Sequence, residues 1–299
     1  MGRATAPAPP LTVVVEENYV DFRSHRTWYR VAGDRNSVAV PLLALHGGPG
    51  STHNYFGPLE QLADRRPVVV YDQIGCGKSD RPTKIDWTAD VFREEVDAVR
   101  EQLQLERIHL LGTSWGGMLA LEHVLGGANG ICSLILSSTL ASIDEWAQEQ
   151  RRLLQELGVE PVSSDDPEHE RVVQLHSDAH FYRGPKPRHE LERMYAERNL
   201  DVYQAMQGPD EWTVTGALRG WDVRERLDEI DVPTLVIRGR YDMSTDKIAA
   251  TLVNGIRNAR EVVLENSSHT PVLEETDAYL ATIDEFMREN ERGSQNAPA

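Results

Sequence analysis

The chain has 299 residues, of which 40% are hydrophobic, so it is long enough to bury a substantial core in one large α/β domain. Its 31 basic and 48 acidic side chains give a formal charge of −17, which argues against nucleic acid or an anionic membrane as a partner. No apolar run approaches the roughly 20 residues that a membrane span needs. The first ten residues lack the apolar core of a signal peptide, so we expect a cytoplasmic protein.

Strand-like and helix-like segments alternate along the chain. Residues 11–31 hold two β-rich runs separated by residues 23–26, which predicts an antiparallel opening pair. Short apolar runs predict buried strands at 41–45, 68–71, 108–111, 131–136, 234–237 and 261–264. Helical spacing of apolar residues predicts helices at 89–105, 118–125 and 278–287. The alternation predicts an α/β fold, with helices on both faces of a mostly parallel eight-stranded sheet.

Residues 141–221 interrupt this alternation. They are rich in charged and aromatic residues, contain several helix-like segments and have no strong strand. Between two strands of a parallel sheet, such a segment predicts a helical cap inserted above the site. The core domain then comprises residues 11–140 and 222–292. Residues 1–10, rich in Pro and Ala, and the tail 293–299 are predicted to be disordered.

The run Gly112-Thr-Ser-Trp-Gly116 lies directly after a predicted strand and before a predicted helix. A serine on such a turn is held in a strained backbone with its hydroxyl exposed at the edge of the sheet. The glycines let neighbouring backbone pass without a Cβ clash. We therefore predict that Ser114 is a nucleophile. The alternative is that the GxSxG pattern arises by chance in a turn that contains glycine. Cys76 is a second, weaker candidate for the nucleophile.

A serine hydroxyl needs an adjacent base, and the base needs an orienting acid. In this architecture the expected chain order is Ser, then Asp or Glu, then His. Asp242 follows the predicted strand 234–237, and His269 follows the predicted strand 261–264. Asp246 is a competing acid, but its position indicates the start of the next helix. The predicted triad is Ser114, Asp242 and His269.

The sequence His46-Gly-Gly-Pro-Gly50 directly follows the predicted strand 41–45. Adjacent glycines let backbone amides approach a ligand closely, and a tetrahedral intermediate needs such donors for its oxyanion. We predict that the amides of Gly48 and Trp115 form this oxyanion hole, and that His46 braces the loop without reacting. The alternative is that residues 46–50 form a plain turn without this role. Because the two cysteines give no disulfide framework and no metal cluster, we expect no metal and no cofactor.

These motifs together resemble the prolyl aminopeptidase (proline iminopeptidase) family of α/β-hydrolases over about residues 11–290. The resemblance rests on five segments: His46-Gly-Gly-Pro-Gly50, Asp72-Gln-Ile-Gly-Cys-Gly-Lys-Ser79, Gly112-Thr-Ser-Trp-Gly-Gly117, Gly239-Arg-Tyr-Asp242 and Ser268-His269. It implies an α/β-hydrolase fold with the triad named above. It also implies an acidic anchor for the free α-amino group of the substrate. The segment Gln207-Gly-Pro-Asp-Glu-Trp-Thr213 resembles that part of the cap, with Glu211 as the anchor and Trp212 in the substrate pocket.

Many members of that family carry a second glutamate directly after the triad aspartate, where this chain has Met243. A carboxylate about 4 Å from an ammonium group contributes on the order of 4 kcal/mol at an effective dielectric near 20, before desolvation costs. The loss of that carboxylate and the gain of a soft apolar side chain in the pocket predict weaker recognition of a free amino terminus. We therefore expect a relaxed aminoacyl-amide hydrolase, including the type that acts on polyketide intermediates in macrolactam pathways.

The predicted reaction is cleavage of the amide bond after an N-terminal aminoacyl group, through an acyl-enzyme. The expected substrate is a small molecule or peptide with a free amino group, either free or bound to a carrier protein. Three alternatives remain: a prolyl aminopeptidase proper, a carboxylesterase on the same scaffold, and a non-catalytic ligand receptor on a hydrolase fold. Comparing the turnover of aminoacyl amides and p-nitrophenyl esters separates the enzymes, and labelling of Ser114 by a fluorophosphonate tests the receptor.

Overall fold

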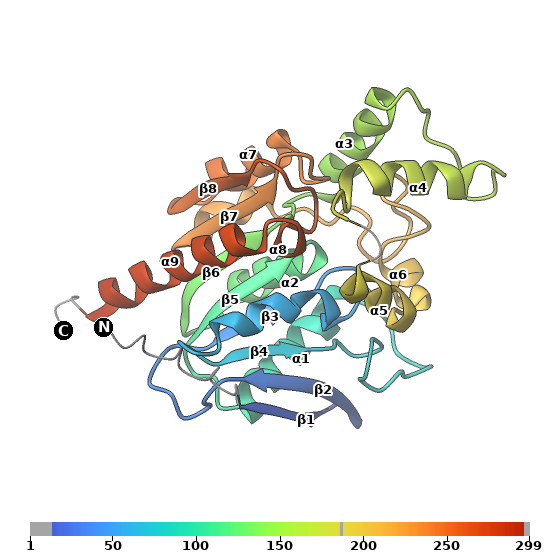
Figure 1. Ribbon diagram of the computed structural model, residues 1–299. Helices are drawn as coiled ribbons and strands as arrows, with labels where there is room; N and C mark the ends of the chain where they lie inside the picture. The colour runs from blue at the N-terminus through green and yellow to red at the C-terminus, as the bar shows by residue number, and fades with distance from the viewer. Residues whose placement is uncertain (1–13, 186–187, 296–299) are drawn as a thin grey trace, which may run out of the picture.

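An eight-stranded sheet runs through the centre of the computed structural model, which describes residues 14–185 and 188–295 (Figure 1). The strands are β1 (Val15–Phe22), β2 (His25–Ala32), β3 (Leu42–Leu45), β4 (Val68–Tyr71), β5 (Ile108–Thr113), β6 (Ile131–Ser137), β7 (Thr234–Gly239) and β8 (Ala259–Leu264). Their order in space is β1-β2-β4-β3-β5-β6-β7-β8. The β1–β2 and β2–β4 pairs are antiparallel, and all pairs from β4 to β8 are parallel. The predicted fold class is confirmed.

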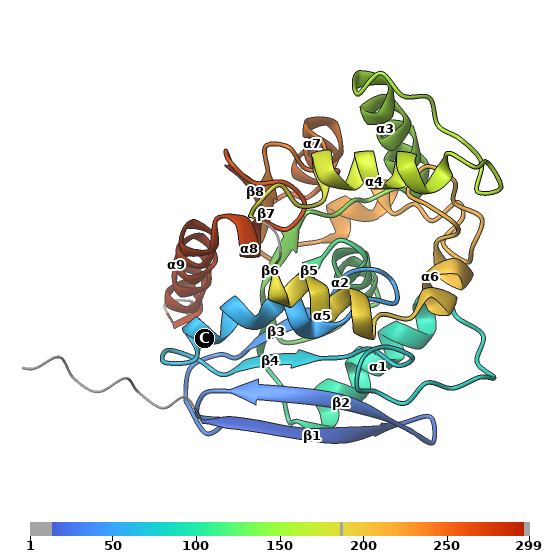
Figure 2. The same cartoon turned by 45° about the vertical axis from the view of Figure 1, so that its right-hand side comes forward.

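Each face of the sheet is covered by its own set of helices (Figures 1 and 2). Successive strand residues point to opposite faces, so Leu43 and Leu45 join one buried cluster while Leu42 and Ala44 join the other. The first cluster packs against α1 (Ala89–Gln102), α2 (Trp115–Leu125) and α7 (Asp246–Gly255). The second packs against the 3₁₀ helix η1 (His53–Leu62), α8 (Pro271–Glu274) and α9 (Thr276–Gln295).

Helix ends depart from the sequence prediction more than strand positions do. The helix predicted at 118–125 begins at Trp115, directly after Ser114. The helix predicted at 278–287 runs from Thr276 to Gln295, so it includes residues 293–295, which the sequence assigned to a disordered tail. Ion pairs anchor the late turns of this helix to the core, from Arg66 to Glu291 (2.6 Å) and from Arg260 to Glu289 (2.7 Å). Residues 1–10 and 296–299, the other predicted disordered positions, lie outside the described residues.

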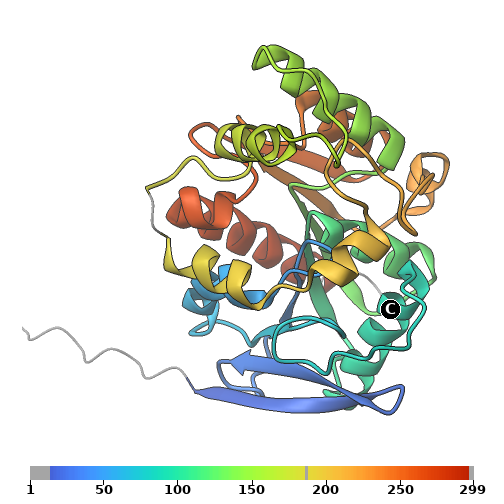
Figure 3. The ribbon, with the colours of Figure 1, turned by 90° about the vertical axis from the view of Figure 1, so that its right-hand side faces the viewer.

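Four α-helices lie in the described chain between β6 and β7: α3 (Ile143–Glu156), α4 (His169–His180), α5 (His189–Glu197) and α6 (Leu200–Met206). An isolated β-bridge joins Ser142 to Asp222, so the outgoing and returning chain lie side by side. Figure 3 shows these helices in front of the sheet, on the side where the parallel strands end. The 3₁₀ helix η2 (Arg224–Glu229) then leads back to β7. In the described part of the chain, no helix combines the length and the apolar character that crossing a bilayer requires.

Candidate active site

Ser114 lies on the sharp turn between β5 and α2, with φ 55° and ψ −122°, a strained conformation for a residue with a side chain. The turn fits only because glycines flank it. A Cβ added to Gly112 would lie 2.2 Å from the carbonyl oxygen of Gly116, and one added to Gly116 would lie 2.0 Å from that of Leu45. Ser114 therefore has the backbone that the sequence motif predicted for an exposed nucleophile.

Asp242 and His269 come together from the ends of β7 and β8. The Oδ1 atom of Asp242 lies 2.6 Å from Nδ1 of His269, and both residues are only 3% exposed. The backbone N–H of Ser244 donates to the same carboxylate oxygen at 2.8 Å, which fixes its position. The competing acid, Asp246, is the first residue of α7 and accepts a hydrogen bond from Arg238. Asp242 is thus the carboxylate that orients the imidazole.

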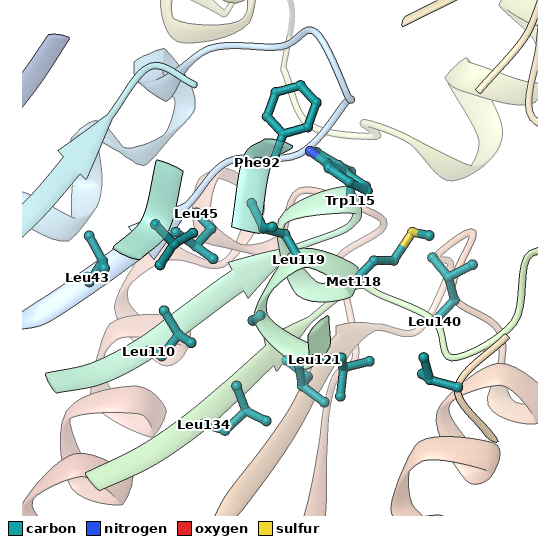
Figure 4. Close-up of a cluster of buried hydrophobic side chains, with 14 of the residues drawn as sticks. Leu43, Leu45, Phe92, Leu110, Trp115, Met118, Leu119, Leu121, Leu134 and Leu140 are labelled. Carbon is teal, nitrogen blue, oxygen red and sulfur yellow. The ribbon is translucent and has the colours of Figure 1, made fainter. Parts of the chain in front are cut away.

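A small pocket lies beside Ser114. It is lined by Gly48, Pro49, Ser114, Trp115, Met118, Leu140, Ile143, Trp146, Gln207, Glu211 and Leu218. Both predicted oxyanion donors, Gly48 and Trp115, are thus brought to the pocket of the serine. The amide of Trp115 is the first of α2 and has no intrahelical acceptor by its position. Figure 4 shows Trp115 and Met118 at the start of this helix, with Leu140 beside them.

The carboxylate of Glu211 enters the same pocket from the loop after α6. One of its oxygens accepts from the indole Nε1 of Trp146 at 2.9 Å, and the other accepts from the hydroxyl of Tyr203 at 2.7 Å. Burial raises the pKa of Glu211. Because each carboxylate oxygen has a further lone pair, the fixed group can still accept hydrogen bonds from a bound ammonium.

The two residues predicted to line the substrate pocket, Met243 and Trp212, lie outside the set that lines this cavity. Met243 is 5% exposed and packs in the buried cluster under α3 and α7, where its carbonyl accepts from Gln150 at 3.0 Å. Trp212 is 2% exposed and packs between α3 and α4, with Nε1 donating to the carbonyl of Val162 at 3.1 Å. Sequence adjacency to Asp242 and Glu211 was a poor guide because neighbouring side chains point in different directions.

A hydrogen-bonded bridge holds the His46–Gly50 loop against the nucleophile turn. The side-chain amide of Gln73 donates to the carbonyl of His46 at 2.8 Å and accepts from Nε1 of Trp115 at 2.8 Å. His46 in turn accepts from the backbone N–H of Gln73 at 3.0 Å, and burial lowers its pKa to about 4. His46 is therefore a neutral brace, as the sequence predicted.

Three residues that support the site were not predicted. Gln73 lies within the Asp72–Ser79 motif, and that motif could have indicated its role. No sequence motif marks Tyr203 or Trp146. Cys76, the weaker candidate nucleophile, is fully buried, and burial raises the pKa of its thiol well above the usual value. A buried thiol of this kind is inert.

A protein-family model for the alpha/beta hydrolase fold matches residues 40–276 of the chain. The chain belongs to the α/β-hydrolase family. The matched range takes in the oxyanion loop, the nucleophile turn, all four helices between β6 and β7, and the Asp242–His269 pair.

Individual relatives show which α/β-hydrolases the chain is similar to. It is 38% identical to the proline iminopeptidase of Levilactobacillus brevis, over 91% of this chain and 96% of the relative. The solved proline iminopeptidase of Mycobacterium smegmatis is 32% identical with a TM-score of 0.83, covering 93% of this chain and 100% of that one. The crystal structure of VinJ is 34% identical with a TM-score of 0.84, covering 92% and 98%. The predicted resemblance is confirmed, and the protein is a serine hydrolase of the aminopeptidase type.

Proposed function

We propose that this α/β-hydrolase cleaves the amide bond that follows an N-terminal aminoacyl group. One observation carries the proposal: a single pocket joins the nucleophile turn at Ser114 to the fixed carboxylate of Glu211. A serine hydrolase that accepted only simple acyl groups would gain nothing from a partly buried carboxylate in its acyl pocket, because removing that charge from water is costly. An ammonium group on the acyl side of the substrate would offset that cost.

The mechanism follows from the placement of each group. Ser114 attacks the amide carbonyl while His269 accepts its proton, and Asp242 fixes the imidazole tautomer and stabilises the imidazolium. The amides of Gly48 and Trp115 stabilise the oxyanion, each by about 3–4 kcal/mol in comparable enzymes. His269 then protonates the leaving amine, and water hydrolyses the acyl-enzyme. Glu211 holds the α-ammonium group and so places the carbonyl for attack.

The pocket supports a small acyl group and relaxed amino-group recognition. Apolar side chains of Met118, Leu140 and Ile143 line it beside Ser114, which suits a small, partly apolar acyl group. Glu211 is the single acidic side chain among the described residues that line it. We therefore favour an aminoacyl-amide hydrolase over a strict prolyl aminopeptidase. In this proposal, residues 141–221 form the cap that closes over the acyl group.

The identity of the leaving group is a further part of the proposal. The anchor in the pocket, Glu211, holds the acyl part of the substrate and not the leaving group. The leaving group can therefore be the amine of a small molecule, including that of an aminoacylated polyketide intermediate of antibiotic biosynthesis. Such an intermediate can be presented free or on a carrier protein. A cytoplasmic location stays a prediction from the first ten residues of the sequence, which the structure does not describe.

The decisive experiment replaces Ser114 with alanine and measures the hydrolysis of a panel of aminoacyl amides, dipeptides with and without proline first, and p-nitrophenyl esters. We expect Ser114→Ala to lose all turnover and all labelling by a fluorophosphonate while its thermal unfolding stays close to that of the wild type. Cys76→Ala is the matched control and should retain activity, because that thiol is buried away from the pocket. Substantial hydrolysis by Ser114→Ala, or esters as the sole wild-type substrates, would overturn the proposal.

A further inference from the structure

The imidazole of His269 packs against two aromatic rings of the segment between β6 and β7. Its ring centre lies 5.9 Å from that of Trp146 and 5.8 Å from that of Phe181. The Trp146 ring belongs to the acyl side, because it lines that pocket and its Nε1 donates to the carboxylate of Glu211 at 2.9 Å. Phe181, directly after α4, is half-buried and lies outside the set that lines the pocket. Phe181 thus offers a second surface beside the imidazole, separate from the acyl pocket.

A row of side chains continues from Phe181 along α5. The ring centre of Tyr195 lies 6.3 Å from that of Phe181, and the guanidinium carbon of Arg198 lies 5.0 Å from the ring centre of Tyr195. Tyr195 is 42% exposed, and Arg198 is exposed as well. The same end of α5 is tied to the oxyanion loop, because the backbone N–H of Asn199 donates to the carbonyl of Gly50 at 2.8 Å. The row therefore runs from the imidazole to the chain beside the oxyanion loop, and it borders the site outside the acyl pocket.

Arg198 is a cation without a carboxylate partner. Among residues 14–185 and 188–295, no carboxylate lies within ion-pair distance of its guanidinium, which contacts the face of Tyr195 instead. Its neighbour on the same helix, Arg193, pairs with Glu197 at 3.7 Å. Carboxylates are plentiful in a chain with a formal charge of −17, so an unpaired guanidinium beside the site is available to an anionic ligand.

We infer that Phe181, Tyr195 and Arg198 bind the leaving group of the substrate, and that this group carries a carboxylate at its far end. The inference rests on the proposed function, in which His269 protonates the leaving amine, so the leaving group must lie against the imidazole. Because the aminoacyl part occupies its own pocket, the leaving group meets the ring of Phe181. The two aromatic rings suit an aliphatic or unsaturated chain, and the guanidinium beyond them suits an anion.

The test uses the full chain and compares leaving groups of increasing length on one acyl group. Alanyl amides of glycine, 4-aminobutyrate and 8-aminooctanoate are each paired with the amide of the uncharged alkylamine of the same length. We expect the acid-to-neutral ratio of kcat/KM to rise with chain length, because two aromatic rings separate Arg198 from the imidazole. For the longest pair the ratio should reach roughly threefold to fivefold, the upper range of an exposed ion pair. Ionic strength of about 0.5 M should remove most of this preference.

Variants of the row assign the preference to its residues. Arg198→Gln should bring the ratio for the longest pair close to one, and Arg198→Lys, which keeps the charge, should preserve most of it. Arg193→Gln is the matched control and should keep the wild-type ratio, because it removes an equal charge that is already paired with Glu197. Phe181→Ala should flatten the rise of kcat/KM with chain length in the uncharged series. A ratio that is independent of length, or equal in the wild type and Arg198→Gln, would overturn the inference.

The same pairs made as esters, with hydroxy acids and alcohols as leaving groups, separate this inference from the proposed function. If the protein cleaves the esters but not the aminoacyl amides, the proposed function fails, whereas the acid-to-neutral ratio is still measured on the esters. If it cleaves the amides and the ratio stays near one at every length, the proposed function stands and the inference fails.

Discussion

In the proposed function the carboxylate of Glu211 selects the substrate, because its two donors hold it in the wall of the pocket. We expect Glu211→Gln to lower kcat/KM for aminoacyl amides roughly 100-fold, since a loss of 2–3 kcal/mol of charge pairing corresponds to that factor. Simple acyl esters lack the ammonium group, so their kcat/KM should change by less than about threefold. Glutamine keeps the acceptor for Tyr203, which makes it a conservative test.

The raised pKa of Glu211 leads to a pH effect that serves as a control for the Glu211→Gln variant. Burial raises the pKa of Glu211, so the charged carboxylate becomes populated only as pH rises through that raised pKa. The KM for an aminoacyl amide should therefore fall with rising pH until the substrate amine itself loses its proton. Simple esters carry no ammonium group, so the amide-to-ester ratio of kcat/KM isolates the effect of Glu211. A ratio that is flat with pH, or equal losses on both substrate classes in Glu211→Gln, would show that another group anchors the amine.

Gln73 is a positioning residue, because its side chain links the loop of Gly48 to the indole of Trp115 without lining the pocket. We expect Gln73→Leu to lower kcat roughly tenfold or more while KM stays nearly constant, since the oxyanion donors lose alignment but the acyl pocket does not. Steady-state kinetics and the rate of fluorophosphonate labelling measure this. Gln155→Leu, on an exposed site of α3, is the control. A loss confined to thermal stability would mean that Gln73 only supports folding.

At the residue scale, the three residues of the proposed triad carry sequence context, whereas the partners of Glu211 carry none. Ser114, Asp242 and His269 each follow a strand, so pattern and chain order single them out. Glu211 came from the family resemblance, since it was one of 48 acidic residues. Trp146 lies 65 positions before it, and only the folded helices bring that indole to the carboxylate.

Among the elements, the β5–turn–α2 unit fixes the nucleophile through backbone contact. A Cβ on Gly116 would meet backbone atoms of Leu45 and His46 at 2.0–2.7 Å, and these cannot move without shifting β3. We expect Gly116→Ala to destabilise the fold by several kcal/mol, measured by urea denaturation. Gly57→Ala is the matched control, because nothing lies within 4 Å of its added Cβ, and it should change stability by less than about 1 kcal/mol. Similar unfolding curves for the two variants would contradict this account of the turn.

At the element scale, strand positions were predictable because short runs of β-branched and aliphatic residues are typical of buried strands. The run Val68–Tyr71 matches β4 at both ends. Helix ends and short helices were harder. η1 contains Gly57 and Pro58, and α8 has four residues, so neither shows an amphipathic repeat. α9 continues past the predicted end because ion pairs with the core hold its last turns, and such partners are distant in sequence.

The whole molecule carries several histidines that folding buries in neutral form. Burial lowers the pKa of His46 and His109 to about 4, and that of His123 and His176 to about 3. The unfolded chain takes up protons at these side chains near pH 6.5, whereas the folded chain does not until about pH 4. Between these values the unfolded state binds more protons, so the free energy of unfolding must fall as pH falls. Each histidine contributes a slope of up to about 1.4 kcal/mol per pH unit.

His123→Gln tests this expectation for one member of the group. The Nε2 atom of His123 lies 3.0 Å from the guanidinium of Arg100, so the oxygen of glutamine can replace it as acceptor without taking up a proton. Urea denaturation from pH 4.5 to pH 6 should give a slope lower than that of the wild type by roughly 1.4 kcal/mol per pH unit at most. Protonation of carboxylates affects both proteins equally and cancels in the difference. His189→Ala, at an exposed site, should keep the wild-type slope. An unchanged slope in His123→Gln would mean that this histidine takes up its proton equally in the folded and unfolded chain.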